Sequence, residues 1–180
     1  MNLPLPKLKA ILLYFSNYTD TKFLGKTKLM KLFYFLDFMH LKEYGTPVTF
    51  DTYVKLEHGP IPSTIKNLVD TAADEIDMSE LSDTIHFEKP EGISMVRVLP
   101  NRNFTKKDES LFSETELEIL KKVCLRFGDK NTQYVEKASH LEAPWRLTEI
   151  PDDISYTLAA EDPDSKVSKE EIEFMLGLMK

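Results

Sequence analysis

The hydrophobic residues near the N-terminus recur at the spacing of an α-helix. Between Leu8 and Phe15 the apolar positions are three or four residues apart, which predicts a helix over about residues 6–18. From Lys26 to Tyr44, apolar residues cover nearly every face of a helix. Because a helix that is apolar all round has to be buried, this segment is predicted to form the centre of the fold and to end at Gly45.

Polar residues that begin helices predict further helices in the second half of the chain. Ser113 and Glu116 have the spacing of a capping box, in which each side chain bonds the backbone N–H of the other residue. The same spacing recurs within residues 168–171 and predicts a terminal helix. Between these two, Asn131 is a candidate cap for a helix that has to end before Pro144.

Extended segments form the minor part of the pattern. Thr84–Phe87 and Ile93–Leu99 flank a turn-rich stretch and predict a β-hairpin. A shorter extended piece, Tyr53–Leu56, is followed by a His-Gly-Pro corner, and Pro62 then begins another helix. The pattern therefore predicts an α+β fold: a mainly α-helical single domain around a central apolar helix, with a small antiparallel β-sheet.

The composition of the chain fits one globular domain. Of its 180 residues, 42% are hydrophobic and 29% are charged, which provides enough apolar surface for a core. The single cysteine, Cys124, excludes an intramolecular disulfide. No stretch approaches the roughly 20 apolar residues of a membrane span, so we expect no membrane contact and a cytoplasmic location.

Charge is distributed unevenly along the chain. Residues 1–72 carry a net charge of +3, residues 73–148 of −4 and residues 149–180 of −6. We expect residues 1–148 to form the domain, and the acidic residues 149–180 to form a C-terminal extension that ends in a helix and packs on it. The overall charge of −7 argues against a general nucleic-acid binder. It fits a partner with a basic surface, but we favour the alternative of a solvated acidic end that keeps the protein soluble.

The sequence shows no recognised catalytic, cofactor or metal motif. The four histidines lack metal-ligand spacing, and the six glycines are too scattered for a phosphate-binding loop. Cys124 falls on the apolar side of a predicted helix and is expected in the core. We therefore expect a protein that is not an enzyme and that needs no metal or cofactor.

One basic cluster is a candidate for nucleic-acid binding. Lys22, Lys26, Lys28 and Lys31 lie at the start of the central helix. The alternative, which we favour, is that these lysines form an exposed rim that keeps a very apolar helix soluble.

Two stretches have a more distinctive pattern. Residues 28–67 join an aromatic-rich helix to a Tyr-Gly turn and a Gly-Pro-Ile corner, and residues 138–146 read Ala-Ser-His-Leu-Glu-Ala-Pro-Trp-Arg. Together they resemble the SocA-like antitoxin family, whose members carry the Panacea domain and are often phage-associated. The positions that match the family pattern are Lys28, Leu29, Lys31, Leu32, Tyr34, Tyr44, Gly45, Tyr53, Gly59, Pro60, His140, Glu142, Pro144 and Trp145.

The resemblance implies a type II antitoxin that neutralises a separately encoded protein toxin by direct binding. Some relatives act as adaptors that deliver the toxin to a AAA+ protease, and the family is tied to prophages and mobile elements. We expect the Gly59-Pro60 corner and Trp145 to be structural, with the tryptophan filling the core; the alternative for both is a contact site for the partner. For the function of the protein, the alternatives to an antitoxin are a nucleic-acid-binding regulator that uses the Lys22–Lys31 face, and a metal-free hydrolase.

Overall fold

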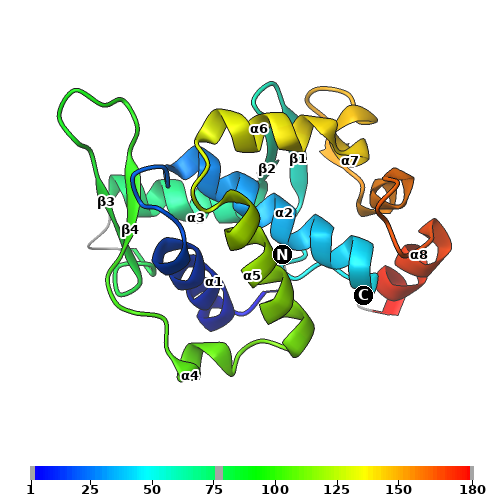
Figure 1. The fold of residues 1–180 in the computed structure, drawn as a ribbon, viewed down its shortest axis with the longest axis horizontal. Helices are drawn as coiled ribbons and strands as arrows, with labels where there is room; N and C mark the ends of the chain where they lie inside the picture. The colour runs from blue at the N-terminus through cyan, green and yellow to red at the C-terminus, as the bar shows by residue number, and fades with distance from the viewer. Residues whose placement is uncertain (1–2, 76–78, 179–180) are drawn as a thin grey trace.

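The computed structural model describes residues 3–75 and 79–178, and helix α2 (Lys26–Tyr44) lies at its centre. Most side chains of α2 are buried, as its apolar pattern predicts, and Figure 1 shows other elements around the helix. The helix ends at Gly45, which has a left-handed backbone with φ of 80° and donates its N–H to the Leu41 carbonyl at 2.8 Å. Glycine adopts this conformation without a steric cost, so the predicted end of α2 is confirmed.

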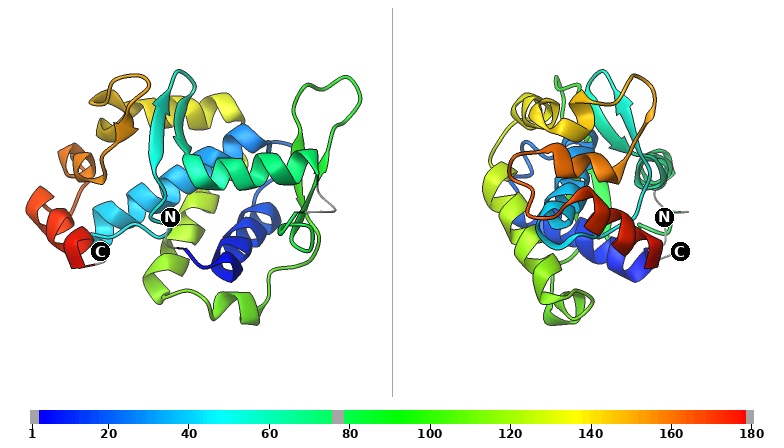
Figure 2. Two further views of the ribbon diagram at one scale, coloured as in Figure 1. Left: turned by 180° about the vertical axis from the view of Figure 1, so that it is seen from behind. Right: turned by 90° about the vertical axis from the view of Figure 1, so that its right-hand side faces the viewer.

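Three further helices surround α2. Helices α1 (Leu5–Tyr18) and α5 (Glu114–Phe127) pack against each other on one side, and α6 (Thr132–Leu141) lies on another (Figures 1 and 2). The capping box of α5 is present: the Glu116 N–H donates to the Ser113 hydroxyl at 3.2 Å, and the Ser113 N–H donates to the Glu116 carboxylate at 2.8 Å. Asn131 caps α6 through the Tyr134 N–H.

A three-stranded antiparallel sheet packs against α2. Strands β1 (Tyr53–Leu56) and β2 (Gly59–Pro62) form a hairpin with Tyr53 opposite Pro62, and β5 (Asp153–Ile154) pairs with the other edge of β1. Helix α3 (Ser63–Asp74) follows β2 directly. The pairing of β5 with β1 was not predicted, because a two-residue strand leaves no periodic pattern in the sequence.

The hairpin predicted within residues 84–99 is present, with a first strand of the expected length and a shorter second strand. Strand β3 (Ile85–Glu88) pairs with β4 (Arg97–Pro100), and this hairpin lies at one end of α2 (Figure 2). A short helix, α4 (Lys106–Glu109), follows the hairpin, in a segment for which no helix or strand was predicted. Its capping box of Thr105 and Asp108 had not been recognised in the sequence.

The residues after Arg146 lie along the other end of α2. They contain β5, the 3-10 helix η2 (Tyr156–Glu161) and helix α8 (Lys169–Leu178), which lies against η2. The predicted cap of α8 is present, because the Glu171 N–H donates to the Ser168 hydroxyl. Ile172 of α8 is fully buried, whereas Met179, predicted to lie on the same face, is outside the described residues.

The structure is thus a mainly helical α+β domain with two small antiparallel sheets. Within residues 3–75 and 79–178, no helix is both long enough and apolar enough to cross a membrane.

Candidate functional site

Two lysines of α2 point into the protein rather than into solvent. Lys28 and Lys31 are both fully buried, and each ammonium group donates to backbone carbonyls. Lys28 reaches Gly128 at 3.0 Å and Lys130 at 2.7 Å, in the connection between α5 and α6. Lys31 reaches Pro60 at 2.9 Å, in β2. Burial lowers the pKa of Lys28 to about 8 and that of Lys31 to about 7.

The predicted basic face is therefore wrong, both as a nucleic-acid surface and as a solubilising rim. Only Lys22 of the four is exposed, and the partly exposed Lys26 pairs with Asp70 at 2.7 Å. The reason is that other elements pack around α2, so the lysine side chains on its surface lie in the interior of the protein. Those lysines then bond the carbonyls of the segments packed against them.

The Gly-Pro corner packs closely against α2 and α6. Gly59 has φ of 96°, a conformation that favours glycine. A Cβ atom at this position would lie 2.8 Å from both Lys31 Cε and Ser139 Oγ. Glycine at this corner therefore allows Lys31 to reach the Pro60 carbonyl.

A buried carboxylate, Asp37, organises the chain after α2. It accepts hydrogen bonds from the backbone N–H groups of Val48 at 2.8 Å and Thr49 at 2.7 Å, from the Thr49 hydroxyl, and from the Tyr53 hydroxyl at 2.8 Å. Burial raises the pKa of Asp37 to about 6, although these hydrogen bonds oppose the rise. The matched position Tyr53 is therefore an anchor of this network. Sequence reasoning missed Asp37, although a lone aspartate on an otherwise apolar helix was a signal for it.

A second buried charge, Lys42, joins three segments of the chain. Its ammonium group lies 2.7 Å from Glu142, 3.5 Å from Asp162 and 3.0 Å from Asp164. Although burial opposes it, the carboxylate of Glu142 raises the pKa of Lys42. Asp162 also accepts the Ala143 N–H at 2.7 Å. Nothing in the local sequence predicted this network, because Lys42 and its partners are about a hundred residues apart.

The His-x-Glu-x-Pro-Trp element spans the end of α6 and helix α7 (Ala143–Arg146). The rings of His140 and Trp145 stack with their centres 3.8 Å apart, and the Lys55 ammonium lies 4.1 Å from the centre of the Trp145 ring. Trp145 is half-buried and packs against the edge of the core, so it is in contact with the core without filling it as expected. Its indole N–H instead donates to the Leu56 carbonyl at 3.3 Å, which joins α7 to the tip of the β1–β2 hairpin.

The remaining matched positions have structural surroundings. Tyr44 is half-buried, and its hydroxyl donates to Glu118 at 2.8 Å. The other side chains, those of Leu29, Leu32, Tyr34 and Pro144, are buried. The matched positions are thus spread over the interior and do not converge on one cavity.

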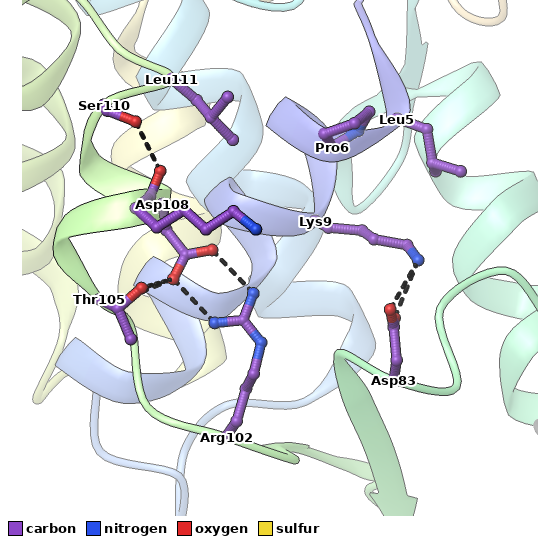
Figure 3. Close-up of a pocket in the computed structure, with 10 residues that line it drawn as sticks. Leu5, Pro6, Lys9, Asp83, Arg102, Thr105, Asp108, Ser110 and Leu111 are labelled. Atoms are coloured by element: carbon purple, nitrogen blue, oxygen red, sulfur yellow. Dashed lines mark hydrogen bonds and ion pairs between the residues drawn. The ribbon is translucent and has the colours of Figure 1, made fainter.

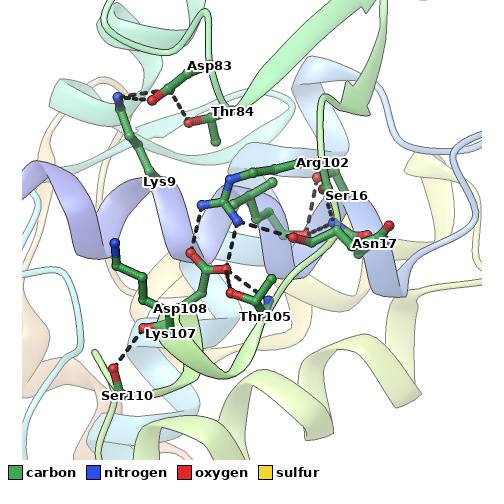
Figure 4. A network of polar contacts seen from close by, with 12 residues as sticks. Lys9, Ser16, Asn17, Asp83, Thr84, Arg102, Thr105, Lys107, Asp108 and Ser110 are labelled. Atoms are coloured by element: carbon green, nitrogen blue, oxygen red, sulfur yellow. Dashed lines mark hydrogen bonds and ion pairs between the residues drawn. The ribbon is translucent and has the colours of Figure 1, made fainter.

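A pocket lies elsewhere, between α1 and α4 (Figure 3). It has a volume of about 540 Å³, with a partly apolar wall that includes Leu5 and Leu111. Four of its five charged side chains form two ion pairs: Lys9 with Asp83 at 2.9 Å, and Arg102 with Asp108 at 2.7 Å (Figure 4). The first pair joins α1 to the segment before β3, and the second joins α4 to the segment after β4.

The chemistry of this pocket does not favour the hydrolase alternative. The two hydroxyls that line it are occupied, since Thr105 donates to Asp108 and Ser110 donates to the Lys107 carbonyl. The Arg102 guanidinium holds the pKa of Asp108 well below its usual range, so this carboxylate is a weak base. The residues that line the described pocket include neither histidine nor cysteine.

Two further groups were considered at the sequence level. Cys124 is buried on the core side of α5, and burial raises the pKa of its thiol to about 12, which is typical of an inert core cysteine. Among the residues that the structure describes, no group of three or more histidine, cysteine, aspartate and glutamate side chains is arranged to hold a metal ion.

Comparison with protein families gives one match. Residues 29–146 match the model described as antitoxin SocA-like, Panacea domain. Searches of curated proteins and of solved structures find no match to the chain. The matched segment begins in α2 and ends with α7, so it includes Lys31 and Lys42, the Gly-Pro corner and the His140–Trp145 stack, whereas Lys28 lies one residue before it. The chain therefore belongs to the SocA-like antitoxin family, which is defined by the Panacea domain.

Proposed function

We propose that this protein is an antitoxin that binds a cognate protein toxin and neutralises it by direct, non-catalytic contact in the cytoplasm. The observation that carries the proposal is the family match over residues 29–146. The matched segment covers about two thirds of the chain and contains all but the first three residues of its central helix.

The internal roles of the matched polar residues support a binding protein. The side chains of Lys28, Lys31 and Glu142 are occupied by contacts within the fold. Paired and buried in this way, they stabilise the fold and are not available to a substrate. Binding then depends on the outer surface of a rigid scaffold, which is the way in which most protein inhibitors work.

The acidic segment after residue 148 belongs to this scaffold in our proposal. Lys42 of α2 pairs with Asp162 and Asp164, and β5 extends the sheet through β1. These contacts join the segment to the part of the chain that matches the family.

The family resemblance implies two ways in which an antitoxin of this kind could neutralise its toxin. In one, the antitoxin only covers the surface that the toxin needs. In the other, which we propose as a second step, the complex is delivered to a AAA+ protease that degrades the toxin. The two routes differ in the lifetime of the toxin, which falls on expression of the antitoxin only if delivery takes place.

The nucleic-acid alternative receives less support. Lys28 and Lys31 are inside the protein, and the chain carries a net charge of −7. A protein that neutralises several phosphates needs exposed lysine or arginine side chains and binds more weakly as salt rises. A steep salt dependence of binding to duplex DNA would restore this alternative.

Co-expression tests the proposed function. The product of the gene adjacent to this one is expressed alone and together with the protein. We expect the neighbour to arrest growth, the protein to restore growth, and the two chains to co-purify as a stable complex. If the neighbour is harmless, or if growth recovers without a complex, direct neutralisation of this toxin is wrong.

A further inference from the structure

Aliphatic side chains are exposed on the segments that flank Trp145 in the sequence or are hydrogen-bonded to α7. Leu141 is 76% exposed, Leu147 55%, Ile150 53% and Leu56 38%. Single exposed leucines are common on protein surfaces, but a group of them beside a half-buried tryptophan is typical of a binding surface. We call these four side chains together with Trp145 the α7 surface.

Hydrogen bonds join the segments that carry the α7 surface. The Trp145 indole N–H donates to the Leu56 carbonyl at 3.3 Å, and Arg146 Nε donates to the Leu141 carbonyl at 3.2 Å. The tip of the β1–β2 hairpin and the end of α6 are therefore both tied to α7. Figure 1 shows these elements side by side at one edge of the molecule.

Lys55 connects the remaining segment to the α7 surface. Its ammonium group donates to the Thr148 carbonyl at 2.7 Å and lies 4.1 Å from the centre of the Trp145 ring. Its backbone N–H donates to the Asp152 carbonyl at 2.9 Å. The turn that carries Leu147 and Ile150 is thus held in place, and a preorganised surface loses less entropy when it binds a partner.

The rim of the α7 surface is acidic. Glu57, Glu149, Asp152 and Asp153 are all exposed, and within the described part of the chain none of them forms an ion pair. Two exposed cations are also near, Arg146 beside Leu147 and Lys137 one helical turn before Leu141, so the carboxylates outnumber them by four to two. Four unpaired carboxylates around an apolar centre attract a partner with basic residues and repel nucleic acid.

We propose that the α7 surface is where the toxin docks, and that the toxin presents to it an apolar protrusion surrounded by lysine or arginine residues. This inference rests on the proposed function and adds the location and the chemistry of the contact. The acidic rim argues against a second copy of this chain as the occupant, since like charges would face each other across the two-fold axis of a dimer.

The test measures affinity for the toxin, purified as the product of the adjacent gene. Leu141→Glu and Leu147→Glu place a charge in the apolar centre, and each is expected to weaken binding at least ~30-fold, as loss of a hot spot does. Leu125→Glu is the matched control, because Leu125 of α5 is 75% exposed and lies outside the α7 surface. The control is expected to bind within about two-fold of the parent, and all variants should melt like the parent.

A charge reversal tests the acidic rim. Glu149→Lys is expected to slow association with the toxin about 10-fold at low salt, with a smaller difference at high salt. Glu170→Lys on α8 makes the same change in net charge away from the rim and serves as its control. An equal effect of the two reversals would show that only net charge matters and would overturn the role of the rim.

The outcomes separate this inference from the proposed function. If the parent binds the toxin and both leucine variants bind equally well, the docking surface is wrong while the antitoxin function stands. If the parent does not bind the toxin, both proposals fall. Dimerisation of the parent that Leu141→Glu abolishes would instead assign the α7 surface to a second copy of this chain.

Discussion

Two regions of this protein reverse the usual placement of charged and apolar side chains. Around α2, the ammonium groups of Lys28, Lys31 and Lys42 are buried and bonded to carbonyl or carboxylate oxygens. At the α7 surface, the aliphatic side chains of Leu141 and Leu147 are largely exposed to solvent. The first region places charge where water is excluded, and the second places hydrocarbon where water is present.

The difference separates residues that hold the fold from residues that are free to bind. A buried lysine is tolerated only when its partners are supplied by the same fold, so it fixes the segments that supply them. An exposed leucine contributes little to folding and is available to a partner. The matched residues Lys31 and Glu142 belong to the first group, whereas Leu141 occupies a position that the family pattern leaves open.

The largest effect is expected from the loss of Lys42. In Lys42→Met, the carboxylates of Glu142 and Asp162 stay buried without a counter-charge, which should cost ~3–5 kcal/mol of unfolding free energy. Chemical denaturation measures this loss. Lys122→Met is the control, since Lys122 pairs with Glu118 at 2.7 Å on the surface and its loss should cost less than ~1 kcal/mol. If Lys42→Met and Lys122→Met lost equal amounts of unfolding free energy, the buried ion pair would be no more important for stability than the exposed one.

A smaller effect on stability is expected from Trp145→Ala. The ring is half-buried, so the loss should be about 2 kcal/mol, below the ~3–5 kcal/mol typical of a fully buried aromatic residue. Toxin binding should fall further than stability, because Trp145 lies at the centre of the α7 surface. Paired melting and affinity measurements separate the two effects. A variant that loses affinity only as far as it unfolds would make Trp145 purely structural.

The buried lysines predict a dependence of stability on pH. Because the pKa of Lys31 is lowered to about 7, the unfolded chain binds a proton that the folded protein lacks between pH 7 and about pH 10. The unfolding free energy should therefore rise with pH in this window, by at most about 1.4 kcal/mol per pH unit from this group. Denaturation of the parent and of Lys31→Met at several pH values measures the slope, and the variant should show less of it. Parallel curves would mean that Lys31 keeps an ordinary pKa.

The smallest effect on stability is expected at the α7 surface itself. Leu141→Ser and Leu147→Ser should change the unfolding free energy by less than ~0.5 kcal/mol, because both side chains are already solvated. Leu120→Ser, at a fully buried position of α5, is the contrasting control and should be strongly destabilising. A loss above ~2 kcal/mol at Leu141 would place it among the residues that the fold requires.

The elements with a strong local signal were predicted well. The apolar pattern of residues 26–44, the Gly45 stop and the Ser113–Glu116 capping box each involve residues within a turn or two of one another, and all are confirmed. Short elements such as β5 and η2 were missed because they have too few residues to show a period. The candidate basic face failed because helical spacing does not reveal which side of a helix its neighbours cover.

The sequence alone determined that a central helix would be buried, where its neighbours would begin and end, and that the chain resembles the SocA-like antitoxins. Only the tertiary structure decided that the lysines of this helix point inward, that Lys42 meets Glu142, and that Trp145 lies at the surface. The reason is physical: capping and periodicity depend on neighbours a few residues away. The partner of a buried charge, or the exposure of a ring, depends instead on segments that meet only after the chain has folded.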